Sequence, residues 1–263
     1  MTVELFFILL LVFMSSAFIK GWSGFGTNLI AMPILVTMLA FGLDQGVTIV
    51  ISVNVFMNIA ILIENKKFNI RSLDNIKMLV VFGVIFTFVG AYFLKSPENA
   101  QALKIIAGSV ITLLALYRIY TTFFEFKRHI NVETMSKYFI PVGIISGFFN
   151  GIAGLGGLPV LILLSNTNME RNKFRTTLVS YFLVMNIVAI IGYAVAGNYT
   201  TFVFSSIGLM IIPSVIACMA GVWLSRRVSD KLFSRVMLGI LLFMGVNLIV
   251  NGVFSTNIIS MFF

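Results

Sequence analysis

Ten apolar segments, joined by short polar connections, account for most of this 263-residue chain. A helix that crosses a bilayer needs about 20 mostly apolar residues, and most of the segments approach that length. Charged residues make up 10% of the chain, whereas soluble domains carry roughly 25%. We therefore expect an all-α, polytopic membrane protein with about 8–10 transmembrane or half-membrane helices. The segments are 3–19, 27–42, 46–63, 76–94, 103–123, 138–151, 155–165, 175–196, 202–224 and 233–253.

The lengths of the segments leave one question open. The second, sixth and seventh are short, and the seventh, 155–165, is compatible with a re-entrant half-helix. The first two segments, and likewise the sixth and seventh, either span the bilayer or form re-entrant hairpins. The first segment has no basic region before it and no cleavage site after it, so we expect it to be a span.

The two halves of the chain repeat each other. Gly21, Gly24 and Gly26 recur at an offset of 130 residues, and two further blocks recur in the same order at offsets of 128 and 131. We predict a first transmembrane repeat at 1–124, a central cytoplasmic loop at 125–137 and a second transmembrane repeat at 138–263. The three blocks pair Gly21, Gly24 and Gly26 with Gly151, Gly154 and Gly156; Ser52, Met57, Asn58 and Ile59 with Ser180, Met185, Asn186 and Ile187; and Gly90, Lys95, Lys104 and Gly108 with Gly221, Arg226, Arg235 and Gly239.

The basic residues predict how the repeats are oriented. Five segments per repeat make the second repeat enter the membrane from the opposite side. With the amino terminus outside, all but Lys95 and Lys104 of the 18 Lys and Arg residues lie on the inner side, as the positive-inside rule requires. Inverted repeats of this kind are common in secondary transporters. We expect both termini outside and the lipid bilayer, not nucleic acid, as the partner of the basic residues.

Glycine clusters interrupt one apolar region in each half: FIKGWSGFGTNLIAMP at 18–33 and FFNGIAGLGGLP at 148–159. Irregular backbone at membrane depth is tolerated where protein or a water-filled cavity surrounds it. A helix that begins at such a break directs free N–H groups and the positive end of its dipole at the loop, which favours an anion. Pro159 suits a first helical turn, and Pro33 either does the same or kinks its helix. Close packing of helices also explains glycines in membrane segments.

We expect the two breaks to bind a small anion through backbone N–H groups. Asn58 and Asn186, at equivalent positions of the repeats, are candidate amide donors, although a helix–helix hydrogen bond also explains them. Lys20 lies at the cytoplasmic rim, where it either sets topology or raises the local anion concentration. The expected break residues of the site are Gly24, Phe25, Gly26, Thr27, Asn28, Gly154, Leu155, Gly156 and Gly157.

The sequence shows no set of residues that could serve as the catalytic groups of an enzyme. None of the nine acidic residues lies in the middle of an apolar segment, and His129 falls in the polar loop. We find no metal-ligand cluster, phosphate loop or nucleophile–base set, so we expect neither an enzyme nor a cofactor nor a metal. Glu64, at the inner end of the third segment, is the best side chain for proton coupling. Proton or sodium coupling, the oligomeric state and carrier versus channel stay open.

The two glycine motifs resemble those of a known family. Gly21-x-x-Gly24-Phe25-Gly26 with Pro33, and Gly147-x-x-x-Gly151-x-x-Gly154-Leu155-Gly156-Gly157-x-Pro159, are similar to the paired motifs of the sulfite exporter TauE/SafE family, also called the toluene sulfonate uptake permease family. The resemblance covers nearly the whole chain, although Thr27 and Asn28 stand where the family often has glycines. It implies a bacterial inner-membrane secondary transporter, working by alternating access, for a small anion such as sulfite, a sulfonate or sulfoacetate. The alternative is a non-transporting membrane scaffold or assembly protein.

Overall fold

In the computed structural model, helices make up almost all of the residues that the structure describes. It describes residues 3–39, 41–65, 73–74, 76–94, 109, 112–113, 116, 132–165, 169, 171–225 and 246. The expected segments 103–123 and 233–253, and the polar loop up to 131, lie almost wholly outside these residues. The helices are α1 (Val3–Ser23), α2 (Thr27–Pro33), the π-helix η1 (Ile34–Met38), α3 (Leu43–Glu64), α4 (Lys77–Phe93), α6 (Val132–Ala153), α7 (Gly157–Ser165), α8 (Arg171–Ala196) and α9 (Thr201–Ser225).

Helix lengths separate spans from shorter elements. Among the described residues, four helices are long and apolar enough to cross a membrane: α1, α3, α8 from Lys173 to Ala196, and α9. This confirms the expectation of an all-α, polytopic membrane protein. At 1.5 Å per residue, the nine residues of α7 cover less than half of the ~30 Å hydrocarbon core. Helix α7 is therefore a half-membrane element, as the short seventh segment allowed.

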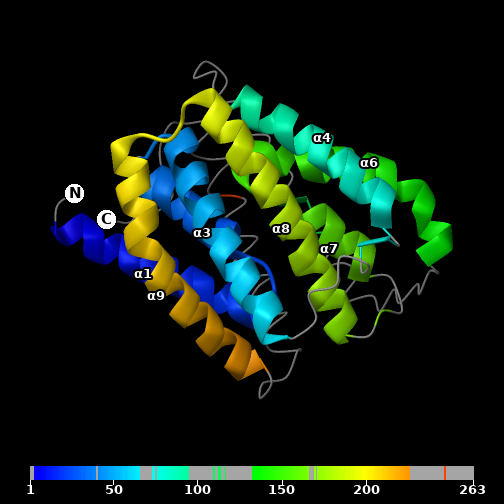
Figure 1. The fold of residues 1–263 in the computed structure, drawn as a ribbon, viewed down its shortest axis with the longest axis horizontal. Coiled ribbons are helices and arrows are strands. Elements are labelled where there is room, and N and C mark those ends of the chain that lie inside the picture. Colours follow the sequence, from blue (N-terminus) through cyan, green and yellow to red (C-terminus); the bar gives the residue numbers. More distant parts are fainter. Residues whose placement is uncertain are drawn as a thin grey trace.

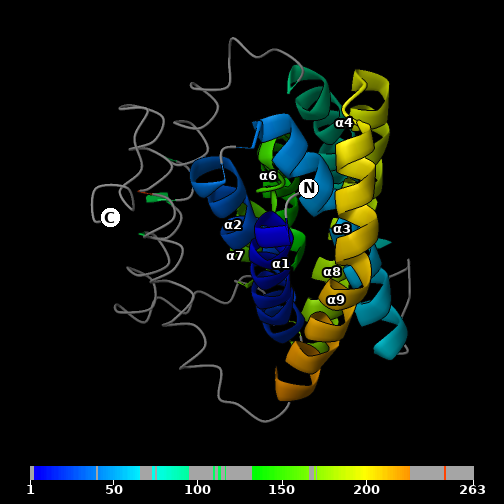
Figure 2. The same cartoon turned by 90° about the vertical axis from the view of Figure 1, so that its left-hand side faces the viewer.

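The helices pack in two matching groups around a central pair. Helices α3 and α8 lie side by side, with α1 and α9 on one side and α4 and α6 on the other (Figure 1). Helix α1 packs on α9 as α6 packs on α4, and α3 packs on α9 as α8 packs on α4. In the perpendicular view, α2 and α7 lie on the side away from α9 (Figure 2). Each of these short helices contacts the helix before it and the helix after it.

Glycines lie where pairs of helices approach each other most closely, and these glycines occupy equivalent positions in the two halves. A Cβ added to Gly21 of α1 would overlap the Cys218 carbonyl of α9, and one added to Gly151 of α6 would overlap the Thr87 carbonyl of α4. The partner glycines Gly221 and Gly90 stand equally close to the Phe18 and Phe148 carbonyls. The equivalent residues of these contacts are separated by the offsets seen in the sequence. The offset is 130 for Gly21 with Gly151 and Phe18 with Phe148, and 131 for Thr87 with Cys218 and Gly90 with Gly221. Small residues at membrane helix interfaces allow such close backbone approach.

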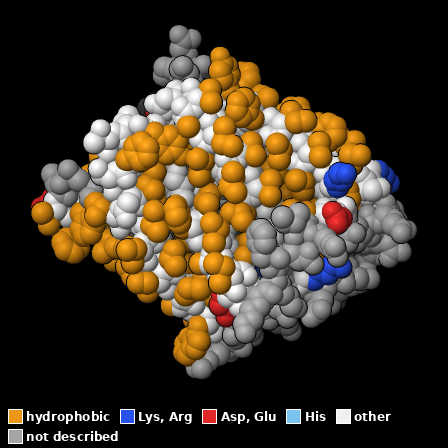
Figure 3. Space-filling model, viewed as in Figure 1, with side chains coloured by type: hydrophobic (Ala, Val, Ile, Leu, Met, Phe, Trp, Pro, Cys, Tyr) orange, Lys and Arg blue, Asp and Glu red, His pale blue; other side chains and the backbone are white. Residues whose placement is uncertain are grey.

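Hydrophobic side chains cover much of the described surface on one face of the molecule. In the view of Figure 3 they are spread over this face among white backbone and other side chains, and the charged side chains that are visible lie toward its edges. Large apolar side chains are exposed on several helices, such as Ile85 of α4, Ile191 of α8 and Ile212 of α9. A surface this apolar suits contact with lipid tails, and it leaves the buried polar residues as the unusual ones.

Candidate functional site

Both glycine clusters break a helix, as the sequence predicted. Helix α1 ends at Ser23 and α2 begins at Thr27, while α6 ends at Ala153 and α7 begins at Gly157. Gly24 and Gly154, which are equivalent in the two repeats, have φ angles of 85° and 66°. Gly26 caps α2 with a φ of 106°. These left-handed conformations favour glycine, so the residue type is required at the break itself.

The two breaks meet at a small cavity. Its volume is about 40 Å³, which is enough for a few water molecules or one small ion, since a water needs roughly 10–15 Å³. It lies beside the middle of α3 and α8. Among the described residues, the lining combines six polar residues with six apolar or glycine residues. They are Lys20, Thr27, Asn28, Asn54, Asn150 and Asn186, and Phe25, Gly26, Gly154, Leu155, Gly157 and Phe182.

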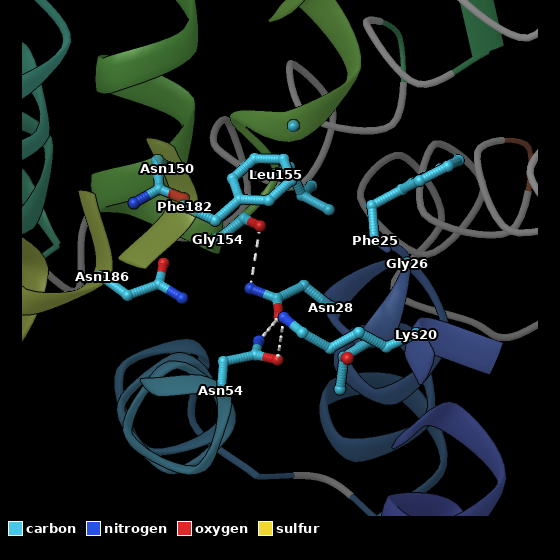
Figure 4. Close-up of a pocket in the computed structure, with 12 residues that line it drawn as sticks. Lys20, Phe25, Gly26, Asn28, Asn54, Asn150, Gly154, Leu155, Phe182 and Asn186 are labelled. Atoms are coloured by element: carbon cyan, nitrogen blue, oxygen red, sulfur yellow. Dashed lines mark hydrogen bonds between the residues drawn. The ribbon is translucent and has the colours of Figure 1, made fainter. Parts of the chain in front are cut away.

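A chain of hydrogen bonds crosses the cavity wall from one half of the protein to the other. Lys20 Nζ donates to Asn54 Oδ1 at 2.8 Å, and Asn54 Nδ2 donates to Asn28 Oδ1. Asn28 Nδ2 then donates to the carbonyl oxygen of Gly154 at 2.8 Å. In Figure 4 these three side chains are joined end to end, and the amide of Asn186 faces the same space. The chain holds the first break against the second.

Lys20 is a buried cation. Its side chain is 3% exposed, and among the described residues no acidic side chain pairs with it. An ammonium group has three N–H donors, and one of them is used on Asn54. A buried charge without a counter-ion is costly in a membrane protein, so Lys20 makes this cavity the candidate functional site.

Two further polar groups at the cavity lack partners. Thr27 Oγ1 and Asn150 Nδ2 form no hydrogen bond with any residue that the structure describes, and their side chains are 1% and 2% exposed. Buried polar groups are nearly always hydrogen-bonded, so each such exception requires a reason. Both residues contribute to the lining of the cavity beside Lys20.

Arg175 of α8 lies nearby but is already engaged. It donates through Nη1 to Ser225 Oγ of α9 at 3.2 Å and through Nη2 to the carbonyl oxygen of Gly21 on α1. Carbonyls at the end of a helix lack partners within the helix, so the guanidinium group satisfies one of them. Arg175 therefore joins the ends of three helices and is not among the described residues that line the cavity.

The structure brings together most of the residues that the sequence singled out. Gly24 and Gly156 lie in the breaks without lining the cavity, Asn58 is fully buried one turn beyond Asn54, and Glu64 is the last residue of α3. The predicted residues that line the cavity are Phe25, Gly26, Thr27, Asn28, Gly154, Leu155, Gly157 and Asn186.

Four lining residues lie outside the expected site: Lys20, which was considered only as a charge at the rim, and Asn54, Asn150 and Phe182. The repeat offsets contained a signal for all four. Lys20 and Asn150 are equivalent at an offset of 130, and Asn54 and Phe182 at an offset of 128. Each pair contributes both members to the cavity, although neither pair is conserved in residue type.

Comparison with known protein families gives one match. The model of the family described as Sulfite exporter TauE/SafE matches residues 8–248, which is nearly the whole chain. No curated protein and no solved structure matches.

Proposed function

Because the chain belongs to the sulfite exporter TauE/SafE family of membrane transporters, we propose that it is a secondary transporter that binds a small sulfur-containing anion in the cavity between the two glycine breaks. The observation that supports this most is the buried Lys20 ammonium, which lines the cavity and has N–H groups beyond the one that donates to Asn54.

The donors around the cavity suit reversible anion binding. The remaining N–H groups of Lys20 and the amide of Asn186 can donate to sulfite or sulfonate oxygens. Asn150 and Thr27 line the same cavity. A hydrogen bond to a charged group contributes about 1.5–3 kcal/mol. A few of them give micromolar to millimolar affinity, roughly 4–8 kcal/mol after the costs of association. A carrier needs affinity of this order, since it must also release its cargo.

The backbone of the breaks contributes less than the side chains. Helix α7 begins at Gly157 beside the cavity, and the positive end of its dipole favours an anion by roughly 0.3–1 kcal/mol. The α-helical part of α2 has seven residues before it continues as the π-helix η1, and we assign it no contribution. We propose that the two repeats alternate in opening this cavity to either side of the bacterial inner membrane.

Glu64 is our proposed coupling residue if transport consumes protons. It ends α3 and is not among the described residues that line the cavity, so it would act at a distance from the cargo. Replacing it by glutamine should flatten the pH dependence of transport. Full pH dependence in a folded Glu64→Gln variant would remove it from the mechanism.

The test of the proposed function is counterflow in proteoliposomes. Proteoliposomes that contain the purified protein are loaded with one unlabelled anion at a time, and uptake of the labelled anion is followed. The panel is sulfite, thiosulfate, methanesulfonate and short carboxylates. We expect exchange of at least one sulfur anion, and at least a tenfold loss of transport in Asn186→Leu.

The matched control is Lys137→Met, which removes an exposed lysine that lies over the Tyr138 ring and should keep wild-type rates. Absence of exchange for every sulfur anion by folded protein would refute the proposal and favour the scaffold alternative.

A further inference from the structure

The cavity contains one cation and no counter-charge of its own. Lys20 is the only charged side chain among the described residues that line it. The remaining polar lining residues are neutral amides and a hydroxyl group, and Phe25, Leu155 and Phe182 supply apolar surface. Arg175, which does not line the cavity, donates hydrogen bonds to the Gly21 carbonyl and to Ser225.

The number of charges on the cargo matters in such an environment. A singly charged anion beside Lys20 leaves the buried site neutral. A doubly charged anion leaves one net negative charge among apolar and amide groups, where uncompensated charge is strongly disfavoured. Neutral hydrogen-bond donors reduce this cost but do not cancel it.

We propose that Lys20 makes the cavity selective for monoanions over dianions of similar size and shape. The inference rests on the proposed function, because it concerns the same cavity, and it narrows the substrate class by charge. A sulfonate or a protonated oxyanion of sulfur fits the site, whereas sulfate and other obligate dianions do not.

The repeat also indicates how the selectivity can be changed. Asn150 occupies the position equivalent to Lys20 and lines the same cavity, and its Nδ2 has no partner among the described residues. An Asn150→Lys substitution therefore places a second cation opposite the first. The site then carries two positive charges, which match a dianion.

Methanesulfonate and sulfate are the probes, because both are tetrahedral at sulfur and carry one and two charges at neutral pH. Dissociation constants are measured by calorimetry on detergent-solubilised protein at matched ionic strength. We expect the wild type to bind methanesulfonate at least tenfold more tightly than sulfate. Lys20→Met should weaken methanesulfonate binding at least tenfold, Asn150→Lys should shift the ratio at least tenfold toward sulfate, and Lys137→Met should change neither.

Three outcomes of these binding measurements would contradict the selectivity inference. Equal or tighter binding of sulfate by the wild type, binding of neither probe, or wild-type affinity in Lys20→Met overturns the inference. The ratio of the two dissociation constants of the wild type is measured without any variant. It therefore tests the inference even if Asn150→Lys does not fold. If the protein exchanges sulfite but shows no preference between monoanions and dianions, the selectivity inference is wrong and the proposed function stands. If no sulfur anion is bound or exchanged, the proposed function falls with it.

Discussion

Asn58 is the residue whose environment least explains its presence. It is fully buried in α3, and neither Oδ1 nor Nδ2 of its amide has a partner among the described residues. Its equivalent, Asn186, lines the cavity. Because a transporter with inverted repeats exchanges the conformations of its halves, we expect Asn58 to line the cavity in the state that opens to the other side.

Asn58→Leu should therefore raise stability and lower transport. An unsatisfied buried amide costs about 1–3 kcal/mol, and an apolar side chain of similar size removes that cost. We expect a higher melting temperature in detergent together with at least a tenfold slower exchange. Asn54→Leu, the same change one turn earlier, removes two hydrogen bonds and should lower the melting temperature. A lower melting temperature for Asn58→Leu would show that its amide has a structural partner.

Lys20 shows where reasoning from single residues stops. A lysine at the end of an apolar segment is typical of a topological charge, so the sequence placed it at the cytoplasmic rim. The structure buries it against Asn54, near the middle of α3. Which part of α3 faces the end of α1 depends on packing between helices, and no local pattern encodes that distance. The free donors of Lys20 were therefore not predictable, although its lysine–asparagine equivalence with Asn150 was visible in the sequence.

At the scale of helices, the glycines divide into two kinds with different roles. Gly24, Gly26 and Gly154 adopt positive φ at the breaks, whereas Gly21 and Gly151 allow helix backbones to touch. The sequence left backbone breaks and close packing as alternatives for the clusters, and both explanations hold for different members. The helices themselves were predictable because apolar segment length determines them. Which helices cross each other could not be predicted, because partners such as α1 and α9 are far apart in the sequence.

Alanine at the crossing glycines should destabilise the protein. A Cβ at Gly21 or Gly151 would overlap a backbone carbonyl of the facing helix, and the helices must separate to admit it. Overpacking of this kind costs about 1–3 kcal/mol. We expect Gly21→Ala and Gly151→Ala to lower the melting temperature by similar amounts, because the two crossings are equivalent.

Gly208→Ala in α9 is the control for this effect. An added Cβ there meets no described atom within 4 Å, and alanine favours a helix over glycine by roughly 0.5–1 kcal/mol. Its melting temperature should stay the same or rise. Equal losses of stability at Gly208 and Gly21 would show that backbone contact is not what the crossing glycines provide.

At the scale of the whole molecule, the distribution of charge predicts topology. If the ten expected segments cross the membrane with the amino terminus outside, all but two of the 18 Lys and Arg residues lie on the inner side. We therefore predict that both termini lie outside and the 125–137 loop inside. Single cysteines introduced into a Cys218→Ala background, at position 2 and at position 128, provide the measurement. A membrane-impermeant maleimide should label position 2 in intact cells and position 128 only after permeabilisation. Labelling of position 128 in intact cells would reverse the predicted orientation.

The halves are also expected to depend on each other for folding. Helix α1 packs on α9 and α4 packs on α6, so the largest helix contacts join residues 1–124 to residues 138–263. Coexpressed segments 1–124 and 125–263 should assemble and exchange anions, while each segment expressed alone should be degraded. A half that accumulates as folded protein by itself would contradict this, and Western blots against tags on each half measure it.

This interleaved packing has an evolutionary consequence. Before the two copies were joined in one chain, a single copy had no α9 for its α1 and no α6 for its α4. The faces that now meet at the glycine crossings would then have been covered by a second, identical polypeptide inserted in the opposite direction. We therefore expect the ancestor of this protein to have been a homodimer of one short gene product present in both orientations. In that case Lys20 and Asn150 diverged only after the copies were joined, and the cavity of the ancestor was symmetric.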